Sequence, residues 1–487
     1  MIRVFWHALV FGLSPVLQKL VGLVLLPLYT HYLTAADYGE IELLSIGTGL
    51  LALVLRFELR PGYMRAWIDA PDEATRAGLF RTVLGAMLAA GAAGGAVVLL
   101  ASGAAGEALL GHRIGWLYRA ALALGLFADV VALVCQATLQ AQLQSARMVT
   151  LGVLQFALSA TLTAWGVVGL GAGPVAFFIG GAVGSLVTLA AMLAMLRPVW
   201  RRRGGAPADL AGLLAYSLPL LGGGLLFFVV RNADRLAVSQ FVSVGDLGLY
   251  AMAWTLANLL LTMVFTPLQT SFDVWRYEVH RDGGREAEMA GFFRIALVVL
   301  GGAAMGLCTF GADVFARAAD PRFAVALIYL PWLSVAVMLQ AGYSFLASPF
   351  YVTGATGRWL RVFAIGAAVQ LGLSLALVPL FGVGGAAASV LLANLAIYVG
   401  AARGGRHLWA VPWPQGRVAV LLGTTLACAS LHGVIRPDSL AFMALADAAE
   451  CLLFAACLLA AGLVTGGDLA ALTRLAASRG AVLLRRV

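Results

Sequence analysis

The stretch VVRNADRLAVSQFVSVGDLGLYAMAW, residues 229–254, places three charged side chains, Arg231, Asp234 and Arg235, within a long apolar run. Their spacing brings all three charges onto one face of a helix. Because an ionised group at the centre of a bilayer costs at least about 2.5 kcal/mol, such charges usually face a bundle interior or a water-filled cavity. We therefore expect them to meet an anion there. The alternative is that Asp234 neutralises either arginine in an ion pair within the helix, which leaves one structural lock between the two halves of the bundle.

The whole chain has the composition of a membrane protein. Of its 487 residues, 62% are hydrophobic and 11% are charged, whereas soluble domains carry about 25% charged residues. Apolar runs of about 20 residues, enough to cross a bilayer as a helix, recur along the chain. They are too long and too continuous for the strands of a membrane barrel. We therefore expect an all-α polytopic membrane protein.

Interruptions by glycine, proline and charge predict about fourteen transmembrane helices. We place them at residues 4–32, 37–57, 79–102, 114–138, 149–170, 174–196, 211–242, 246–270, 291–313, 324–347, 358–380, 384–402, 416–434 and 440–464. Most of the 32 lysine and arginine residues then fall on the side that holds both termini. The positive-inside rule makes this side the cytoplasm. The net charge of +9 is thus a topology signal, and we expect the lipid bilayer, not nucleic acid, as its partner.

A short pattern near the N-terminus recurs within residues 229–254. HYLTAADYGEIEL (31–43) aligns with QFVSVGDLGLYAM (240–252). The shared residues are Thr34, Asp37 and Gly39 in the first copy and Ser243, Asp246 and Gly248 in the second. Because a hydroxyl side chain caps a helix and an aspartate is stabilised at its positive N-terminal end, we expect both copies to begin helices.

Later segments repeat in the same order, which indicates two related halves. LQFALSATL (154–162) aligns with VQLGLSLAL (369–377), and GAGPVA (171–176) with GVGGAA (382–387), where glycines are expected to turn the chain between helices. The six helices expected between matching positions make the repeats parallel, an arrangement typical of transporters with alternating access around a central cavity. We expect an N-terminal lobe of helices one to six (1–203), a C-terminal lobe of helices seven to twelve (204–410), two additional helices (411–465) and a basic cytoplasmic tail (466–487).

Charged side chains in the first helix of each expected lobe are the candidate substrate-binding groups. Lys19, the only lysine, is expected to face the cavity together with Arg231 and Arg235, although a lone lysine also snorkels to the interface. Asp129 lies near the middle of the fourth expected helix. It is either a proton-titrating coupling site or a hydrogen-bonded structural residue.

Amide side chains within the expected spans have two possible roles. Gln155 and Gln370, at matching repeat positions, are candidate sugar contacts, and the same chemistry applies to Gln136, Gln140, Gln340 and Asn394. Hydrogen bonding between helices is the commoner role of such amides. The five cysteines are expected to be small buried hydrophobes. Asp447 and Glu450 lie outside the repeat, and the sequence suggests no role for them.

NADRLAVSQFVSVGDLGLYAMAW (232–254) resembles the segment around the seventh and eighth helices of the polysaccharide flippases. This family of O-antigen and exopolysaccharide exporters belongs to a superfamily that also contains multidrug and lipid II transporters. PLYTHYLTAADYGEIELL (27–44) is similar to the family's first hairpin. The chain departs from the family pattern in ELRPGYMR (58–65), which keeps Arg65 but has Arg60 where an aspartate is common. With Arg56, these arginines make the expected inner mouth more basic.

The resemblance implies a transporter that is not an enzyme. Its implied substrate is an oligosaccharide repeat unit on a polyprenyl diphosphate, moved from the inner to the outer leaflet of a bacterial inner membrane for surface polysaccharide synthesis. Arginine pairs well with phosphate oxygens, so Arg231, Arg235 and Lys19 are expected to hold the diphosphate, with Asp234 beside them. A polysaccharide polymerase and chain-length machinery are the implied protein partners.

The sequence also limits the energy source and the alternatives. The chain has no GxxxxGK[ST] loop, so we expect no cofactor and a driving force from a proton or sodium gradient, the membrane potential or removal of the product. A drug or cation antiporter of the same superfamily predicts an acidic cleft. A lipid II flippase of the same superfamily is a further alternative function. A glycan polymerase or glycosyltransferase needs acid and base residues on the outer face, where the expected loops are short.

Overall fold

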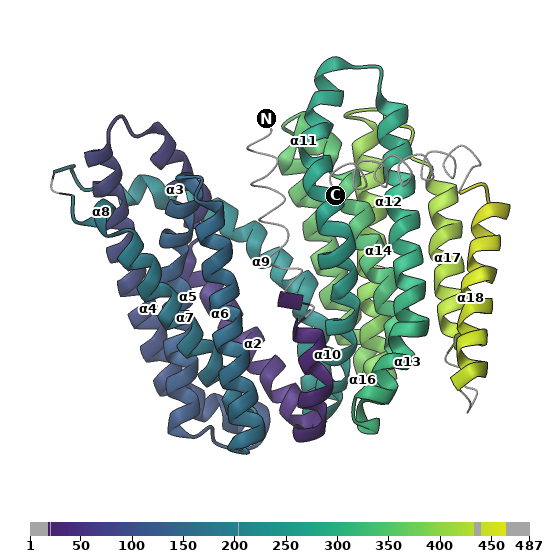
Figure 1. Ribbon diagram of the computed structural model, residues 1–487. Coiled ribbons are helices and arrows are strands. Elements are labelled where there is room, and N and C mark those ends of the chain that lie inside the picture. Colours follow the sequence, from purple (N-terminus) through teal and green to yellow (C-terminus); the bar gives the residue numbers. More distant parts are fainter. Residues whose placement is uncertain (1–17, 20, 203, 433–439, 464–487) are drawn as a thin grey trace, which may run out of the picture. The chain divides into compact units, whose positions relative to one another are not determined.

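A computed structural model gives the fold of all residues except 1–17, 20, 203, 433–439 and 464–487 (Figure 1). The described residues form helices and no strands. Ten of these helices are long and apolar enough to cross a membrane. The prediction of an all-α polytopic membrane protein is confirmed. Most of the first expected span and the expected tail, 466–487, lie outside the described residues.

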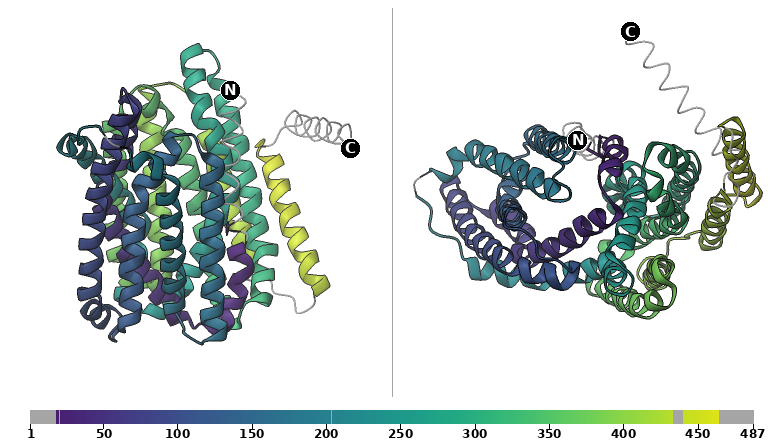
Figure 2. Two further views of the ribbon diagram at one scale, coloured as in Figure 1. Left: turned by 60° about the vertical axis from the view of Figure 1, so that its left-hand side comes forward. Right: turned by 90° about the horizontal axis from the view of Figure 1, so that it is seen from below.

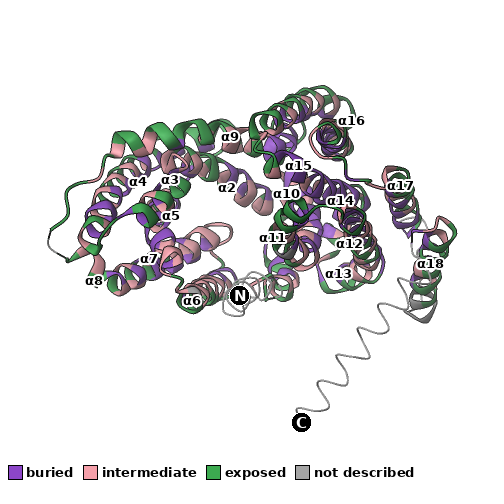
Figure 3. Cartoon of the chain, turned by 90° about the horizontal axis from the view of Figure 1, so that it is seen from above, coloured by how far each residue is buried: buried purple, intermediate pink, exposed green. Residues whose placement is uncertain are grey.

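The outward sides of the helices carry large apolar side chains. Figure 3 shows buried residues where helices pack together and exposed residues along the opposite sides. Leu100 is 79% exposed, Ile365 64% and Leu371 46%, although all three lie within long helices. Exposing such apolar faces to water is unfavourable, whereas contact with the acyl chains of a bilayer is favourable.

The chain divides into two compact units. The first unit comprises Met1–Met252, Ala318–Phe323 and Phe363–Ala393. It contains α2 (Ala35–Arg56), α3 (Leu59–Asp69), α4 (Glu73–Leu110), α5 (Trp116–Ala141), α6 (Ser145–Ala164), the π-helix η1 (Trp165–Gly169), α7 (Val175–Met195), α8 (Arg197–Trp200), α9 (Leu210–Phe241) and the start of α10 (Val244–Leu259). The helix α5 packs against α4 and α7, and both α2 and α3 pack against α9. Large side chains such as Tyr63, Phe80 and Met87 fill its core.

The second unit comprises Ala253–Arg317, Ala324–Val362 and Asn394–Val487. It contains η2 (Leu260–Phe265), α11 (Thr266–Asp282), α12 (Glu286–Gly306), η3 (Leu307–Gly311), α13 (Ala312–Ala318), most of η4 (Pro321–Tyr329), α14 (Leu330–Leu346), α15 (Ser348–Val352), α17 (Gln415–His432) and α18 (Leu440–Ala460), with both ends of α16 (Thr356–Arg406). The helix α12 packs against α14 and α17, and α17 packs against α18. Figure 2 gives two further views of these helices, which run roughly parallel within each unit.

The observed helices follow the expected order of spans, with two differences. Residues 59–69, expected as part of an inner loop, form the helix α3. The spans expected at 358–380 and 384–402 both belong to α16, which bends at Gly382 with φ 59° and ψ −138°. Gly171, its repeat partner, also has φ 59°. The glycine turns predicted in both copies are therefore confirmed, because this backbone conformation favours glycine. The division into two lobes and two additional helices stays a prediction.

Both copies of the N-terminal motif cap a helix as the sequence predicts. In α2, the Asp37 backbone N–H donates to Thr34 Oγ1 at 3.2 Å, and the Thr34 backbone N–H donates to Asp37 Oδ2 at 2.8 Å. In α10, the Asp246 backbone N–H donates to Ser243 Oγ at 2.9 Å. The hydroxyl residue therefore satisfies a backbone donor that the first turn leaves unpaired.

The motif glycines bring these two helix starts into direct contact. A Cβ atom on Gly39 would lie 1.7 Å from the carbonyl oxygen of Val244, and one on Gly248 would lie 1.9 Å from that of Ala35. Ala35 and Val244 are themselves repeat partners, so each copy makes the same contact with the other. The two copies of the sequence repeat thus contact each other symmetrically, at positions where only glycine fits.

Replacing Gly39 with alanine is expected to destabilise the protein by about 1–3 kcal/mol or more, because the new methyl group overlaps a backbone oxygen. Thermal unfolding in detergent checks this. Gly47→Ala is the matched control in the same helix, since its Cβ meets nothing within 4 Å. That control should leave the melting temperature unchanged or raise it, because alanine favours a helix over glycine. Equal melting temperatures for both variants would contradict the close contact.

Candidate functional site

A break between α2 and α3 shapes the candidate site. Phe57 and Glu58 both adopt left-handed backbone conformations, with φ 50° and 49°. Each such conformation costs a non-glycine residue about 1–2 kcal/mol, and this kind of strain is concentrated at functional sites. The break redirects the chain between Arg56, at the end of α2, and Arg60, in the first turn of α3. Both arginines consequently reach the same cavity.

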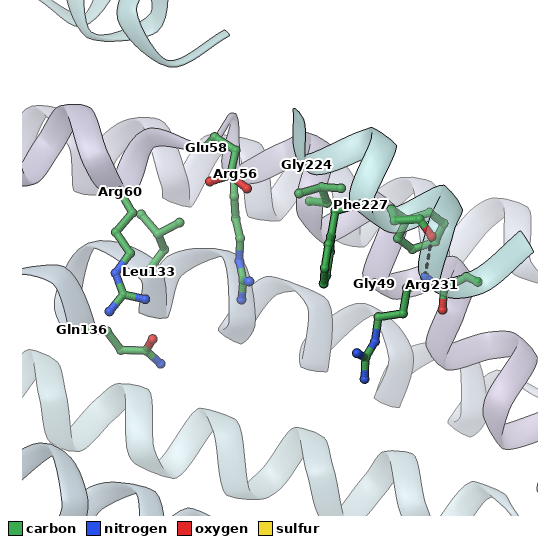
Figure 4. Close-up of a pocket in the computed structure, with 12 residues that line it drawn as sticks. Gly49, Arg56, Glu58, Arg60, Leu133, Gln136, Gly224, Phe227 and Arg231 are labelled. Carbon is green, nitrogen blue, oxygen red and sulfur yellow. Dashed lines mark hydrogen bonds between the residues drawn. The ribbon is translucent and has the colours of Figure 1, made fainter. Parts of the chain in front are cut away.

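This cavity, called the basic cavity below, has a volume of about 420 Å³, within the range of roughly 300–1,000 Å³ of small-molecule sites. It lies entirely within the first unit, between α2, α3, α5 and α9. It is lined by Gly49, Leu53, Arg56, Glu58, Arg60, Leu133, Gln136, Gly224, Phe227, Phe228, Arg231 and Asn232. Figure 4 shows the guanidinium groups of Arg56, Arg60 and Arg231 extending to the same side, with the Gln136 amide beside Arg60.

The charges of the basic cavity are mainly positive. Arg56 forms an ion pair with Asp129, and Arg60 donates a hydrogen bond of 2.6 Å to Gln140 Oε1. The charges of Lys19 and Arg231 act on one another, so these two predicted cations lie in the same region. Glu58 is the single acidic residue in the cavity lining. An anion with several oxygen atoms would meet guanidinium groups from three helices here, and such groups bind anionic oxygens well.

A second cavity of about 360 Å³ lies on the other side of the Arg56–Asp129 pair. Asp129 lines it, and Gly49 borders both cavities. Its lining includes the hydroxyl groups of Ser45 and Thr48 and the aromatic rings of Phe177 and Phe178. Hydroxyl groups and aromatic rings are the usual partners of polar, ring-shaped ligands. We call this space the hydroxyl-lined cavity.

Asp234 and Arg235 lie in buried contacts next to the basic cavity and do not line it. Arg235, 7% exposed, forms an ion pair with Glu42 of α2, and Asp234, fully buried, accepts a hydrogen bond of 2.8 Å from the hydroxyl of Tyr250. Of the three charges in the opening stretch, Arg231 therefore lines the cavity, and Asp234 and Arg235 contact neighbouring helices. Arg235 thus connects α9 to α2 within the first unit.

The predicted sugar contacts and the third arginine of the inner mouth lie elsewhere. Gln155 of α6 donates to Ser185 Oγ of α7 at 3.0 Å. The buried Gln370 donates to Ser374 Oγ one turn along the same helix at 3.0 Å and to Ser389 Oγ in the helical arm beyond Gly382 at 3.4 Å. Both amides are thus positioned as interhelical contacts. Arg65 is exposed, 3.6 Å from Asp69, and does not reach the basic cavity.

Several residues of the site are not among those predicted from the sequence. Glu42 lies inside the expected span 37–57, so its charge at bilayer depth was a usable signal. Phe227, Phe228 and Asn232 lie within one turn of Arg231 on α9, and their position at the cavity follows from that of Arg231. Glu58 had no signal, because it enters the lining only through the break between α2 and α3.

Comparisons with known proteins bear on this geometry. The model of a family described as polysaccharide biosynthesis protein matches residues 30–272, which contain every residue that lines the two cavities. No curated protein matches the sequence.

Solved structures share the fold at low sequence identity. An inward-facing multidrug resistance MATE family transporter of the MOP superfamily matches with TM-score 0.66 and 16% identity, over 86% of this chain and 99% of that one. Lipid II flippase MurJ in an inward closed conformation matches with TM-score 0.65 and 11% identity, over 93% and 97%. A MOP superfamily transporter from Pyrococcus furiosus, described as having a binding pocket of reverse polarity, matches with TM-score 0.57 and 14% identity, over 85% and 96%.

Proposed function

The chain belongs, through residues 30–272, to the polysaccharide biosynthesis family, and from this premise we propose that it flips a polyprenyl-diphosphate-linked oligosaccharide. The movement runs from the inner to the outer leaflet of the bacterial inner membrane, by alternating access, and supplies surface polysaccharide synthesis. The fold, shared with MATE transporters and a lipid II flippase, is compatible with this activity. A polysaccharide polymerase on the outer side would then consume the product.

The three arginines of the basic cavity carry the proposal. A diphosphate has two adjacent groups of anionic oxygens, and guanidinium groups bind such oxygens in pairs. Arg56, Arg60 and Arg231 come from three different helices yet extend into one space (Figure 4). We infer that they hold the diphosphate, that Lys19 adds positive charge beside Arg231, and that Arg235 acts through Glu42 to position α9.

The hydroxyl-lined cavity supports a site for the sugars. Asp129, the partner of Arg56, lines it, and Gly49 lines both cavities, so a sugar attached to the diphosphate would lie close to it. Ser45 and Thr48 offer hydrogen bonds, and Phe177 and Phe178 offer apolar ring faces. The prenyl chain would remain in the bilayer through a lateral opening.

We propose Asp129 as the coupling residue. Its carboxylate pairs with Arg56, and a proton taken up by Asp129 would weaken this pair so that Arg56 can bind the diphosphate. Asp129→Asn should therefore make flipping in proteoliposomes insensitive to an imposed pH gradient. Asp69→Asn is the control, because Asp69 is exposed and lies away from both cavities. A pH response in Asp129→Asn equal to that of the wild type would contradict the assignment.

A deletion strain tests the proposed function and separates it from the alternatives. Loss of the gene should cause one lipid-linked oligosaccharide to accumulate on the inner face, and plasmid-borne wild-type protein should remove it. Accumulation of lipid II would instead assign a lipid II flippase, and unchanged glycan lipids with increased drug sensitivity would assign an antiporter. Full-length lipid-linked glycans that reach the outer face without polymerising would point to a polymerase.

A further inference from the structure

Four titratable side chains, called the C-terminal cluster below, meet in the second unit between α13, α17 and α18. They are Asp313, His432, Asp447 and Glu450. His432, the last residue of α17, lies at the centre. Its Nδ1 is 3.4 Å from Asp447 Oδ1 and 3.2 Å from Glu450 Oε2, and its Nε2 is 3.3 Å from Asp313 Oδ1.

The polar atoms on the Nδ1 side are buried and lack hydrogen bonds. The side chains of His432, Asp447 and Glu450 are 11%, 3% and 5% exposed. His432 Nδ1, Asp447 Oδ1 and both carboxylate oxygens of Glu450 have no hydrogen-bond partner among the described residues. Leaving charged oxygens buried without a partner is costly, so a group from outside the described residues is expected among them.

The two nitrogens of His432 face different surroundings. Asp313, which faces Nε2, is 3.9 Å from Arg317 on the next turn of α13. A carboxylate that accepts the Nε2 proton fixes the neutral tautomer and turns the lone pair of Nδ1 toward Asp447 and Glu450. A metal-binding imidazole usually donates its other ring N–H to a carboxylate in this way.

Charge balance gives the valence of the missing group. Arg317 pairs with Asp313, and a His432 that binds a cation through Nδ1 contributes no charge of its own. Asp447 and Glu450 lie three residues apart on α18 and form no ion pair with an arginine or lysine of the described residues. One divalent cation would neutralise both.

The distances from His432 Nδ1 to the two carboxylates fit such a cation. Ligands about 2.0–2.2 Å from a tetrahedral zinc ion lie about 3.3–3.6 Å from one another. The separations of 3.4 and 3.2 Å from His432 Nδ1 to the two carboxylates are close to this range. One imidazole and two carboxylates suit Zn²⁺ and also Mn²⁺.

We propose that His432 Nδ1, Asp447 and Glu450 bind one divalent transition-metal ion, with Zn²⁺ the preferred ion and Asp313 the positioning residue. The ion joins α17 to α18, and through Asp313 it fixes this pair to α13. It is a structural site separate from the basic cavity, and it gives a role to two carboxylates that lie outside the sequence repeat.

Metal binding to the untagged, full-length protein in detergent tests the proposal. After treatment with a chelator and dialysis against Zn²⁺, the wild type should retain one ion per chain by elemental analysis, and Zn²⁺ should raise its melting temperature. The variant Asp447→Asn/Glu450→Gln keeps the shapes of the side chains and should lose both effects. Asp313→Asn should bind Zn²⁺ about 10- to 100-fold more weakly, as expected for a positioning residue.

Controls come from exposed residues of the same unit. Glu278→Gln and His407→Ala should bind Zn²⁺ as the wild type does. The proposal is overturned if the wild type retains neither Zn²⁺ nor Mn²⁺, or if the double variant retains as much as the wild type. Should the double variant fail to elute as a folded protein, the affinity of Asp313→Asn decides. Flipping activity enters none of these measurements, so the result is independent of the proposed transport function.

Discussion

Arg231→Ala is expected to lower the rate of diphosphate-linked oligosaccharide flipping in proteoliposomes by about 10- to 100-fold. A hydrogen-bonded contact between charged groups contributes about 1.5–3 kcal/mol, and alanine removes every donor of the guanidinium group. Arg231 lines the basic cavity and has the charge of Lys19 close by. Its loss therefore removes a direct contact with the head group and also weakens the positive potential around it.

Arg113→Ala is the matched control for this result. Arg113 is exposed and pairs with the exposed Glu107 at 2.7 Å, away from both cavities. Such surface pairs contribute little, so the control should flip substrate at nearly the wild-type rate. If Arg231→Ala and Arg113→Ala flip equally well, Arg231 does not contact the substrate.

Arg235→Ala is expected to lower the free energy of unfolding by about 3–5 kcal/mol, because it leaves the carboxylate of Glu42 without its partner in a mostly buried position. The side chains of Arg235 and Glu42 are 9% and 24% exposed. Denaturant titration in detergent micelles measures this loss. The effect belongs to the packing of α9 on α2 and differs in kind from that of Arg231→Ala.

The double variant Arg235→Ala/Glu42→Gln separates packing from substrate binding. Removing the second charge should recover most of the lost stability, because no unpaired carboxylate remains. If Arg235 acts only by positioning α9, flipping should recover together with stability. A stable double variant that does not flip substrate would instead place Arg235 in contact with the diphosphate, as the sequence first suggested.

The sequence predicts those parts of the fold that depend on local chemistry. Apolar length sets the spans, hydroxyl and aspartate side chains set the starts of α2 and α10, and Gly171 and Gly382 set turns. The repeat could be aligned for the same reason, since its motif residues act within one helical turn. The contact of Gly39 with Val244 needs the tertiary structure, because it joins residues about two hundred positions apart.

The candidate site was predictable only in part. Charge at bilayer depth identified Arg231 as well as Arg235, and sequence alone cannot tell which of two arginines on one helical face meets a carboxylate on another helix. The break falls at Phe57 and Glu58, whereas Pro61 and Gly62, the residues that would mark a turn in the sequence, lie inside α3. His432 and its carboxylates come from three helices, so their meeting depends wholly on packing.

Binding of a short-chain polyprenyl diphosphate to the purified protein tests the central claim most directly. Calorimetry should detect binding to the wild type, and the triple variant Arg56→Gln/Arg60→Gln/Arg231→Gln should bind at least about 100-fold more weakly, since three charged contacts are lost together. The corresponding polyprenyl alcohol should bind both proteins equally weakly. Equal affinity of the wild type and the triple variant for the diphosphate would contradict a basic cavity that holds the head group.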